Sequence, residues 1–187
     1  AFMNAHPNVE LDISLNDRIV DLVEEGFDAA VRIARLENSS LIGRRLASTR
    51  MCLCAAPSYL DKYEPLTALA DLTAHGVIAY TNFASRNEWQ FKGPNGNESG
   101  ITRSVLRCNN GDTCRSIAIA GGGISLQPSF MVAEDLRRGD LVEILTEYQS
   151  VELGIYAVYP TRKHLAPKVR VLINFLAEHF AQPKWEE

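Results

Sequence analysis

The sequence of 187 residues lacks the long apolar run that a membrane span requires. Its longest uncharged stretch, Ser116 to Ala133, is broken by Gly121-Gly122-Gly123, Gln127 and Pro128, whereas a span needs about 20 mostly apolar residues. An excess of basic residues is also lacking, since 19 Lys and Arg stand against 23 Asp and Glu, a formal net charge of −4. Binding a phosphate backbone normally needs a basic face. We therefore expect no membrane segment and no DNA binding by this chain alone.

Cysteine is scarce, with four residues scattered along the chain. Four are too few for a disulfide scaffold at this length. Cys52 and Cys54 lie two apart on an expected strand and suit a core of small residues. Cys108 and Cys114 flank an Asn-Asn-Gly turn and fit either reduced thiols or a redox pair. None of the four histidines has metal-ligand spacing with these thiols, so we expect no metal and no cofactor.

Catalytic and targeting motifs are missing as well. The sequence shows no strand-Ser-helix elbow, no Cys/His pair in obvious reach and no phosphate-binding loop. The glycines at 121–123 close an expected helix, whereas a phosphate-binding loop opens one. The first seven residues show neither the basic segment nor the apolar core of a secretory signal. These absences favour a cytoplasmic protein that is not an enzyme.

What the chain does contain is an alternation of strand and helix patterns. Residues 9–15 alternate apolar and polar side chains and predict a half-buried strand, and a helix is expected from Asn16 or Asp17 to Gly26. The apolar run from Ala29 to Ile33 predicts the next strand, so the three elements predict a βαβ unit with parallel pairing. The remaining expected strands are Met51 to Ala56, Val77 to Tyr80, Leu106 to Cys108, Ile124 to Pro128, Leu141 to Leu145 and Ile155 to Tyr159.

Helix and hairpin patterns fill the spaces between these strands. Trp89 to Phe91 predicts a hairpin strand whose partner would be Ile101 to Val105, with a turn at residues 93–96. A helix is expected to begin at Asp112, where Asp or Thr side chains either cap the helix or share its first N–H groups with a ligand anion. The clearest helix follows Pro167 and has one apolar face, formed by Val169, Leu172, Ile173, Leu176 and Phe180.

Residues 21–60 carry a distinctive series, DLVEEGFDAAVRIARLENSSLIGRRLASTRMCLCAAPSYL. This series resembles the effector-binding domain of LysR-type bacterial transcriptional regulators. The resemblance continues in order over nearly the whole chain, through residues 71–75, 109–112, 120–128, 133–136, 139–142 and 155–160.

The resemblance implies an α/β fold of two Rossmann-like lobes joined by two crossing strands, similar to type 2 periplasmic binding proteins. Lobe one would comprise residues 1–50 and 161–187, and lobe two residues 51–160, with crossings near Arg50-Met51 and Tyr159-Pro160. The family also carries an N-terminal winged helix-turn-helix and a linker helix. Neither is expected within these 187 residues, and the first strand and part of the first helix of lobe one are expected to be missing.

In two-lobed α/β folds a ligand lies at the carboxyl ends of the strands, where loops and helix N-termini supply hydrogen bonds. Arg35 there would either bind a ligand carboxylate through two parallel bonds or form a surface salt bridge. For Thr81, Asn82 and Ser129 the alternative to ligand contact is ordinary loop polarity. By position this rule predicts an effector site formed by Ala34, Arg35, Thr81, Asn82, Asn110, Gly111, Asp112, Thr113, Pro128, Ser129 and Phe130.

The function implied by the resemblance is that of a ligand-sensing and oligomerising domain. A small effector bound between the lobes would favour one arrangement of a homodimer or homotetramer, and DNA would be bound only by the N-terminal domain outside this chain. The alternative is a periplasmic solute-binding protein, which would need an export signal. An enzyme ranks last, because no catalytic constellation is found.

Overall fold

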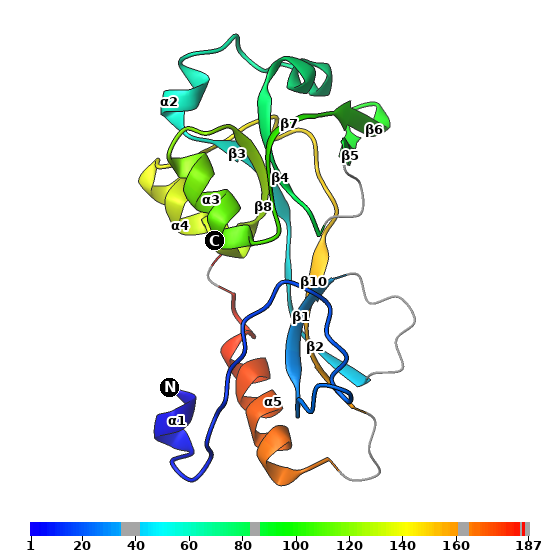
Figure 1. Ribbon diagram of the computed structural model, residues 1–187, viewed down its shortest axis with the longest axis vertical. Coiled ribbons are helices and arrows are strands. Elements are labelled where there is room, and N and C mark those ends of the chain that lie inside the picture. Colours follow the sequence, from blue (N-terminus) through cyan, green and yellow to red (C-terminus); the bar gives the residue numbers. More distant parts are fainter. Residues whose placement is uncertain (35–41, 83–86, 161–164, 184, 186–187) are drawn as a thin grey trace. The chain divides into compact units, whose positions relative to one another are not determined.

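The strands of the described residues form three sheets, with helices packed beside them (Figure 1). The computed structural model describes residues 1–34, 42–82, 87–160, 165–183 and 185. These residues divide into two units, Ala1–Ser48 with Leu153–Trp185, and Thr49–Glu152. Both units combine strands with helices, which confirms the predicted α/β class.

Unit one is built on a three-stranded sheet in the order β1-β10-β2. The middle strand pairs antiparallel with β1, with Ala30 opposite Val158. Val169 and Ile173 of the C-terminal helix are buried, as its apolar face predicts, and the Phe2 ring lies 5.2 Å from the Phe175 ring. The elements of this unit are α1 (Phe2–Ala5), β1 (Ala30–Ala34), β2 (Ile42–Thr49), β10 (Leu153–Tyr159) and α5 (Pro167–His179).

The predicted βαβ unit at the start of the chain is wrong. Between α1 and β1 the chain forms turns and irregular backbone, with neither the strand expected over residues 9–15 nor the helix ending at Gly26. A strand is stable only beside a hydrogen-bonding partner, and β1 pairs antiparallel with β10 instead. Two of the four apolar side chains of the expected strand are therefore exposed, Ile13 at 70% and Leu15 at 91%.

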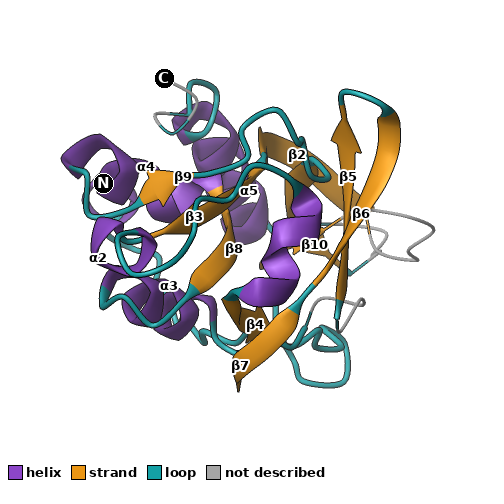
Figure 2. Ribbon diagram, turned by 90° about the horizontal axis from the view of Figure 1, so that it is seen from above, coloured by secondary structure: helices purple, strands orange, loops and turns teal. Residues whose placement is uncertain are grey.

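Unit two is organised by a five-stranded sheet in the order β7-β4-β8-β3-β9 (Figure 2). Strand β4 runs parallel to both of its neighbours, whereas β3 runs antiparallel to β8 and to β9. All five residues of β3 are buried, as expected for an apolar central strand. The strands are β3 (Met51–Ala55), β4 (Gly76–Tyr80), β7 (Arg103–Cys108), β8 (Ile124–Pro128) and β9 (Val142–Glu143).

Two helices, α3 (Gly111–Ile119) and α4 (Ser129–Arg138), cover one face of this sheet (Figure 1). The core beneath them is made of small and medium-sized side chains, because Cys114 and Ala118 of α3 and Val132 of α4 face the sheet. All four cysteines belong to this layer: Cys52, Cys54 and Cys114 are buried in it and Cys108 packs against it. Close packing of small side chains lets the helices approach the sheet closely.

Unit two also contains shorter elements: α2 (Pro57–Leu60), the 3₁₀ helix η1 (Leu69–Ala74) and the hairpin of β5 (Glu88–Gly93) with β6 (Gly96–Ile101). The predicted hairpin partner, Ile101 to Val105, is wrong by several residues. Gly93 pairs directly with Gly96, so the strand resumes immediately after the turn. Trp89 and Phe91 alternate with exposed neighbours and are buried on the inner face of the hairpin.

Several boundaries also moved. The strand expected at Leu141 to Leu145 is reduced to β9, and α2 begins at Pro57, where the ring favours a first helical turn. The compact unit that contains β1 resumes at Leu153, since β10 pairs with β1. The lobe boundaries near Arg50-Met51 and Tyr159-Pro160 stay predictions. None of the helices in the described ranges combines the length and the apolar character of a membrane span.

Thiol reactivity tests the core of unit two. Burial raises the pKa of Cys52 and of Cys54 to about 12, and the thiolate is the reactive form. We expect dithiodipyridine to modify the half-buried Cys108 first and the three buried cysteines only after unfolding in guanidinium chloride, as followed by mass spectrometry. Equal rates at all four thiols in the folded protein would contradict this core.

Acidification tests the packing around His75. This side chain is buried beside the rings of Tyr59 and Tyr63, with its Nδ1 3.4 Å from the Tyr59 hydroxyl, and burial lowers its pKa. The unfolded chain then binds a proton more readily than the folded one, so the contribution of His75 to stability is complete above about pH 6.5 and is lost as the pH falls below it.

We expect the urea midpoint of wild type to drop below about pH 6.5 and His75→Gln to flatten that drop. The matched control is His179→Gln on the exposed end of α5, which should keep the wild-type profile. A profile for His75→Gln that parallels wild type would show that His75 does not set the pH dependence.

Candidate functional site

Four segments of unit two meet at one edge of its sheet because of the strand directions. This edge is the side of the sheet that is formed by strand ends. Strands β7, β4 and β8 are parallel neighbours, so their carboxyl ends share this edge. Strand β3 is antiparallel to β8, with Met51 opposite Pro128, so its amino end reaches the same edge. In open α/β sheets this is the edge where ligands bind.

The ends of β4 and β7 are joined by hydrogen bonds at this edge. The backbone N–H of Thr81 donates to the carbonyl of Cys108 at 2.8 Å. The side-chain amide of Asn82 donates to the Tyr80 hydroxyl at 3.1 Å and to the Asn109 carbonyl at 3.5 Å. Thr81 and Asn82 are both exposed, so this part of the edge offers polar groups to the solvent.

Helix α3 starts at the edge with Asn110 as its N-cap. The Asn110 side-chain oxygen accepts from the backbone N–H of Thr113 at 2.8 Å and from its hydroxyl at 2.9 Å. The helix was expected to begin at Asp112 with an Asp or Thr cap; it begins at Gly111, because Asn110 has the extended backbone that a cap requires. Asp112 and Thr113 are exposed in the first turn.

Helix α4 starts beside the segment that enters β3. The backbone N–H of Ser129 donates to the Arg50 carbonyl at 2.8 Å, and the hydroxyls of Ser129 and Thr49 lie 3.0 Å apart. Thr49 is 0% and Ser129 3% exposed, so this hydroxyl pair is buried. Pro128 forms the N-cap and supplies no side-chain hydrogen bond to the helix. The first N–H of α4 is therefore satisfied by the Arg50 carbonyl.

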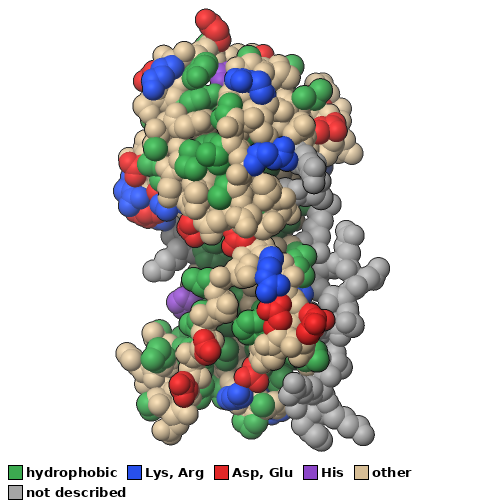
Figure 3. Space-filling model, in the orientation of Figure 1, with side chains coloured by type: hydrophobic (Ala, Val, Ile, Leu, Met, Phe, Trp, Pro, Cys, Tyr) green, Lys and Arg blue, Asp and Glu red, His purple; other side chains and the backbone are tan. Residues whose placement is uncertain are grey.

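Arg50 follows Thr49 in the chain and carries a cation that is bound to Glu143. Its guanidinium bonds both carboxylate oxygens of Glu143, with Nη2 2.8 Å from Oε2, and this hydrogen bonding raises the pKa of Arg50. The Arg50 side chain is 57% exposed, so solvent screening weakens the pair. On the face shown in Figure 3, basic side chains lie singly or beside acidic ones and form no continuous patch among the described residues.

The structure places nine of the predicted site residues at this one edge: Thr81, Asn82, Asn110, Gly111, Asp112, Thr113, Pro128, Ser129 and Phe130. Ala34 ends β1 in unit one, and Arg35 lies outside the described residues. The sequence did not predict Thr49 and Arg50 at this edge, because its pattern does not show that β3 pairs antiparallel with β8. Within the described ranges no group of His, Cys, Asp and Glu side chains is arranged to hold a metal ion.

Comparison with known proteins identifies the family of the chain. The LysR substrate binding domain family matches residues 1–181. An HTH-type transcriptional regulator of Haemophilus influenzae is 34% identical over 175 residues, covering 93% of this chain and 61% of the relative. The transcriptional activator AaeR of Escherichia coli is 32% identical over 181 residues, covering 96% of this chain and 58% of AaeR.

Solved structures show the same fold. The regulatory domain of CrgA from Neisseria meningitidis has a TM-score of 0.86 at 28% identity, covering 96% of this chain and 88% of that one. Full-length AphB, a Vibrio cholerae virulence activator of the LTTR family, has a TM-score of 0.82 at 27% identity, covering 96% and 61%. The chain spans about 60% of the length of the curated relatives it matches, which are transcriptional regulators and not solute-binding proteins. It belongs to the LysR substrate-binding domain family.

Proposed function

We propose that this chain senses a small effector at the polar edge of unit two and thereby controls a longer transcriptional regulator. The observation that carries the proposal is the convergence of two helix N-termini, α3 and α4, with the Thr49–Ser129 hydroxyl pair at one sheet edge. The two units correspond in this proposal to the two lobes of the family. Ala34 and Arg35 of lobe one stay predicted effector contacts.

The chemistry of the edge favours an effector with hydrogen-bond acceptors. Helix N-termini present backbone N–H groups and a partial positive charge, and hydroxyls can donate or accept. Arg50 adds a cation whose present partner, Glu143, is itself only partly buried. Carboxylates, amino acids and aromatic acids are therefore the compounds to test first.

The regulator as a whole is proposed to work in the cytoplasm as a homodimer or homotetramer. Its helix-turn-helix segment would lie outside this chain and make the DNA contacts, which agrees with the net charge of −4 found here. Effector binding can alter DNA binding only if the effector prefers one arrangement of the assembly. The proposal gives this chain no catalytic role.

A thermal-shift screen of carboxylates, amino acids and aromatic acids tests the proposal. A ligand at a hundred times its Kd stabilises the folded state by about 2.7 kcal/mol, which gives a measurable rise in Tm. For a compound that raises Tm, calorimetric titration of Ser129→Ala and Thr81→Ala should show Kd values weaker by about tenfold, the loss of one hydrogen bond to a charged group.

The matched control is Thr73→Ala, which removes an exposed hydroxyl bonded to the Ala70 carbonyl on η1, away from the edge. Its Kd should equal that of wild type. Unchanged affinity in both Thr81→Ala and Ser129→Ala would remove these residues from the site.

A further inference from the structure

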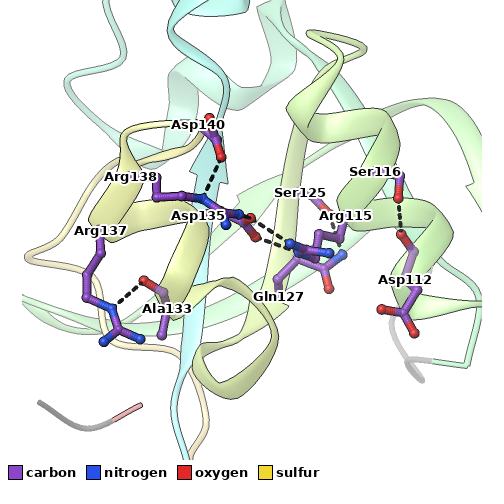
Figure 4. Close-up of polar contacts among 10 residues, drawn as sticks. All are labelled: Asp112, Arg115, Ser116, Ser125, Gln127, Ala133, Asp135, Arg137, Arg138 and Asp140. Atoms are coloured by element: carbon purple, nitrogen blue, oxygen red, sulfur yellow. Dashed lines mark hydrogen bonds and ion pairs between the residues drawn. The ribbon is translucent and has the colours of Figure 1, made fainter. Parts of the chain in front are cut away.

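A buried carboxylate links the two helices that start at the candidate site. Asp135, in the last turn of α4, is 0% exposed. Arg115 of α3 reaches it with two bonds, Nε to Oδ2 at 2.5 Å and Nη2 to Oδ1 at 2.6 Å (Figure 4). Arg138, from the same helix as Asp135, adds a third bond to Oδ1 at 2.9 Å and also contacts Asp140 at 3.0 Å.

The two arginines differ in what they connect. Arg138 lies three residues after Asp135 on α4, so its bond stays within one helix. Arg115 comes from α3, so its paired bonds join the two helices, and the planar guanidinium sets both distance and direction. Arg115 is also the better shielded arginine, with 27% of its side chain exposed against 53% for Arg138.

The apolar contacts beneath the helices hold them less specifically. The side chains of α3 and α4 that are fully buried in the layer against the sheet are short, namely Cys114, Ala118 and Val132. Larger apolar side chains of both helices are only partly buried beside them: Ile117, Ile119, Met131 and Leu136. Apolar burial is non-directional. The directional bonds between Arg115 and Asp135 are therefore the contact best suited to fix how α3 lies against α4.

Both helices are short and carry this constraint to the sheet edge. At about 1.5 Å per residue, Arg115 lies about 6 Å along α3 from Gly111, and Asp135 about 9 Å along α4 from Ser129. Because helices are stiff over such lengths, a fixed contact at these points also fixes the two N-termini.

We infer that Arg115 is a positioning residue, which through Asp135 sets the spacing of the α3 and α4 N-termini and so the affinity for the effector. The inference rests on the proposed function for its effect on affinity. The positioning itself concerns α3 and α4 alone and can be measured without an effector.

The experiment compares Arg115→Met with Arg138→Met in the whole chain. Each substitution removes one arginine from Asp135 and keeps a long apolar side chain, but only the first one breaks the link between the helices. Hydrogen exchange of the amides from Cys114 to Ala118, which follow the first turn of α3, should be about tenfold faster in Arg115→Met. Arg138→Met should exchange there within about twofold of wild type.

Arg115→Lys serves as the conservative variant. Lysine keeps the charge but cannot form two parallel bonds, so it should restore slow exchange only in part. Equal acceleration in both methionine variants would overturn the positioning role, because loss of a general stabilising charge would then explain both. The absence of acceleration in either variant would overturn it as well.

Affinity is measured with sodium benzoate as the probe, a small aromatic acid. Arg115→Met should bind it about tenfold more weakly than wild type and Arg138→Met within about twofold, the size of effect seen when a supporting residue is lost. Equal affinities in all three proteins would overturn the effect on binding. If benzoate binds none of them, the proposed function fails for aromatic acids, and the exchange data still decide the positioning role.

Discussion

The reversed direction of β3 beside β8 is the constraint on which the site in unit two depends. Because β3 runs antiparallel, the chain enters it at the same sheet edge where β8 ends. This places Thr49 beside Ser129 and lets the Arg50 carbonyl accept from the first N–H of α4. A parallel β3 would have begun at the opposite edge, and the hydroxyl pair could not form.

The rest of unit two supports this edge with a rigid scaffold. β3 is buried along its whole length, and α3 and α4 pack on the sheet through small side chains. Apolar packing supplies most of the stability, while the polar link between Arg115 and Asp135 supplies direction. Exposed polar groups such as Thr81 and Asn82 sit at strand ends on top of this frame, which is the usual division between scaffold and binding residues.

The sequence predicted well wherever the local pattern decided the structure. The apolar strands β4 and β8 and the α5 helix after Pro167 followed from periodicity. The prediction failed where strand pairing decided the structure, because the alternation of apolar and polar residues over 9–15 cannot show whether a partner strand lies beside them. Thr49 and Arg50 were missed for a similar reason, since strand direction is a property of the sheet.

Proton–nitrogen correlation spectra recorded while a stabilising effector is added test most directly whether this edge is the binding site. We expect the largest amide shifts at Thr81, from Asn110 to Thr113 and at Ser129, with little change at Gly76 and Ile124, which begin β4 and β8 at the opposite edge. Largest shifts at that opposite edge, with none at the starts of α3 and α4, would contradict this expectation.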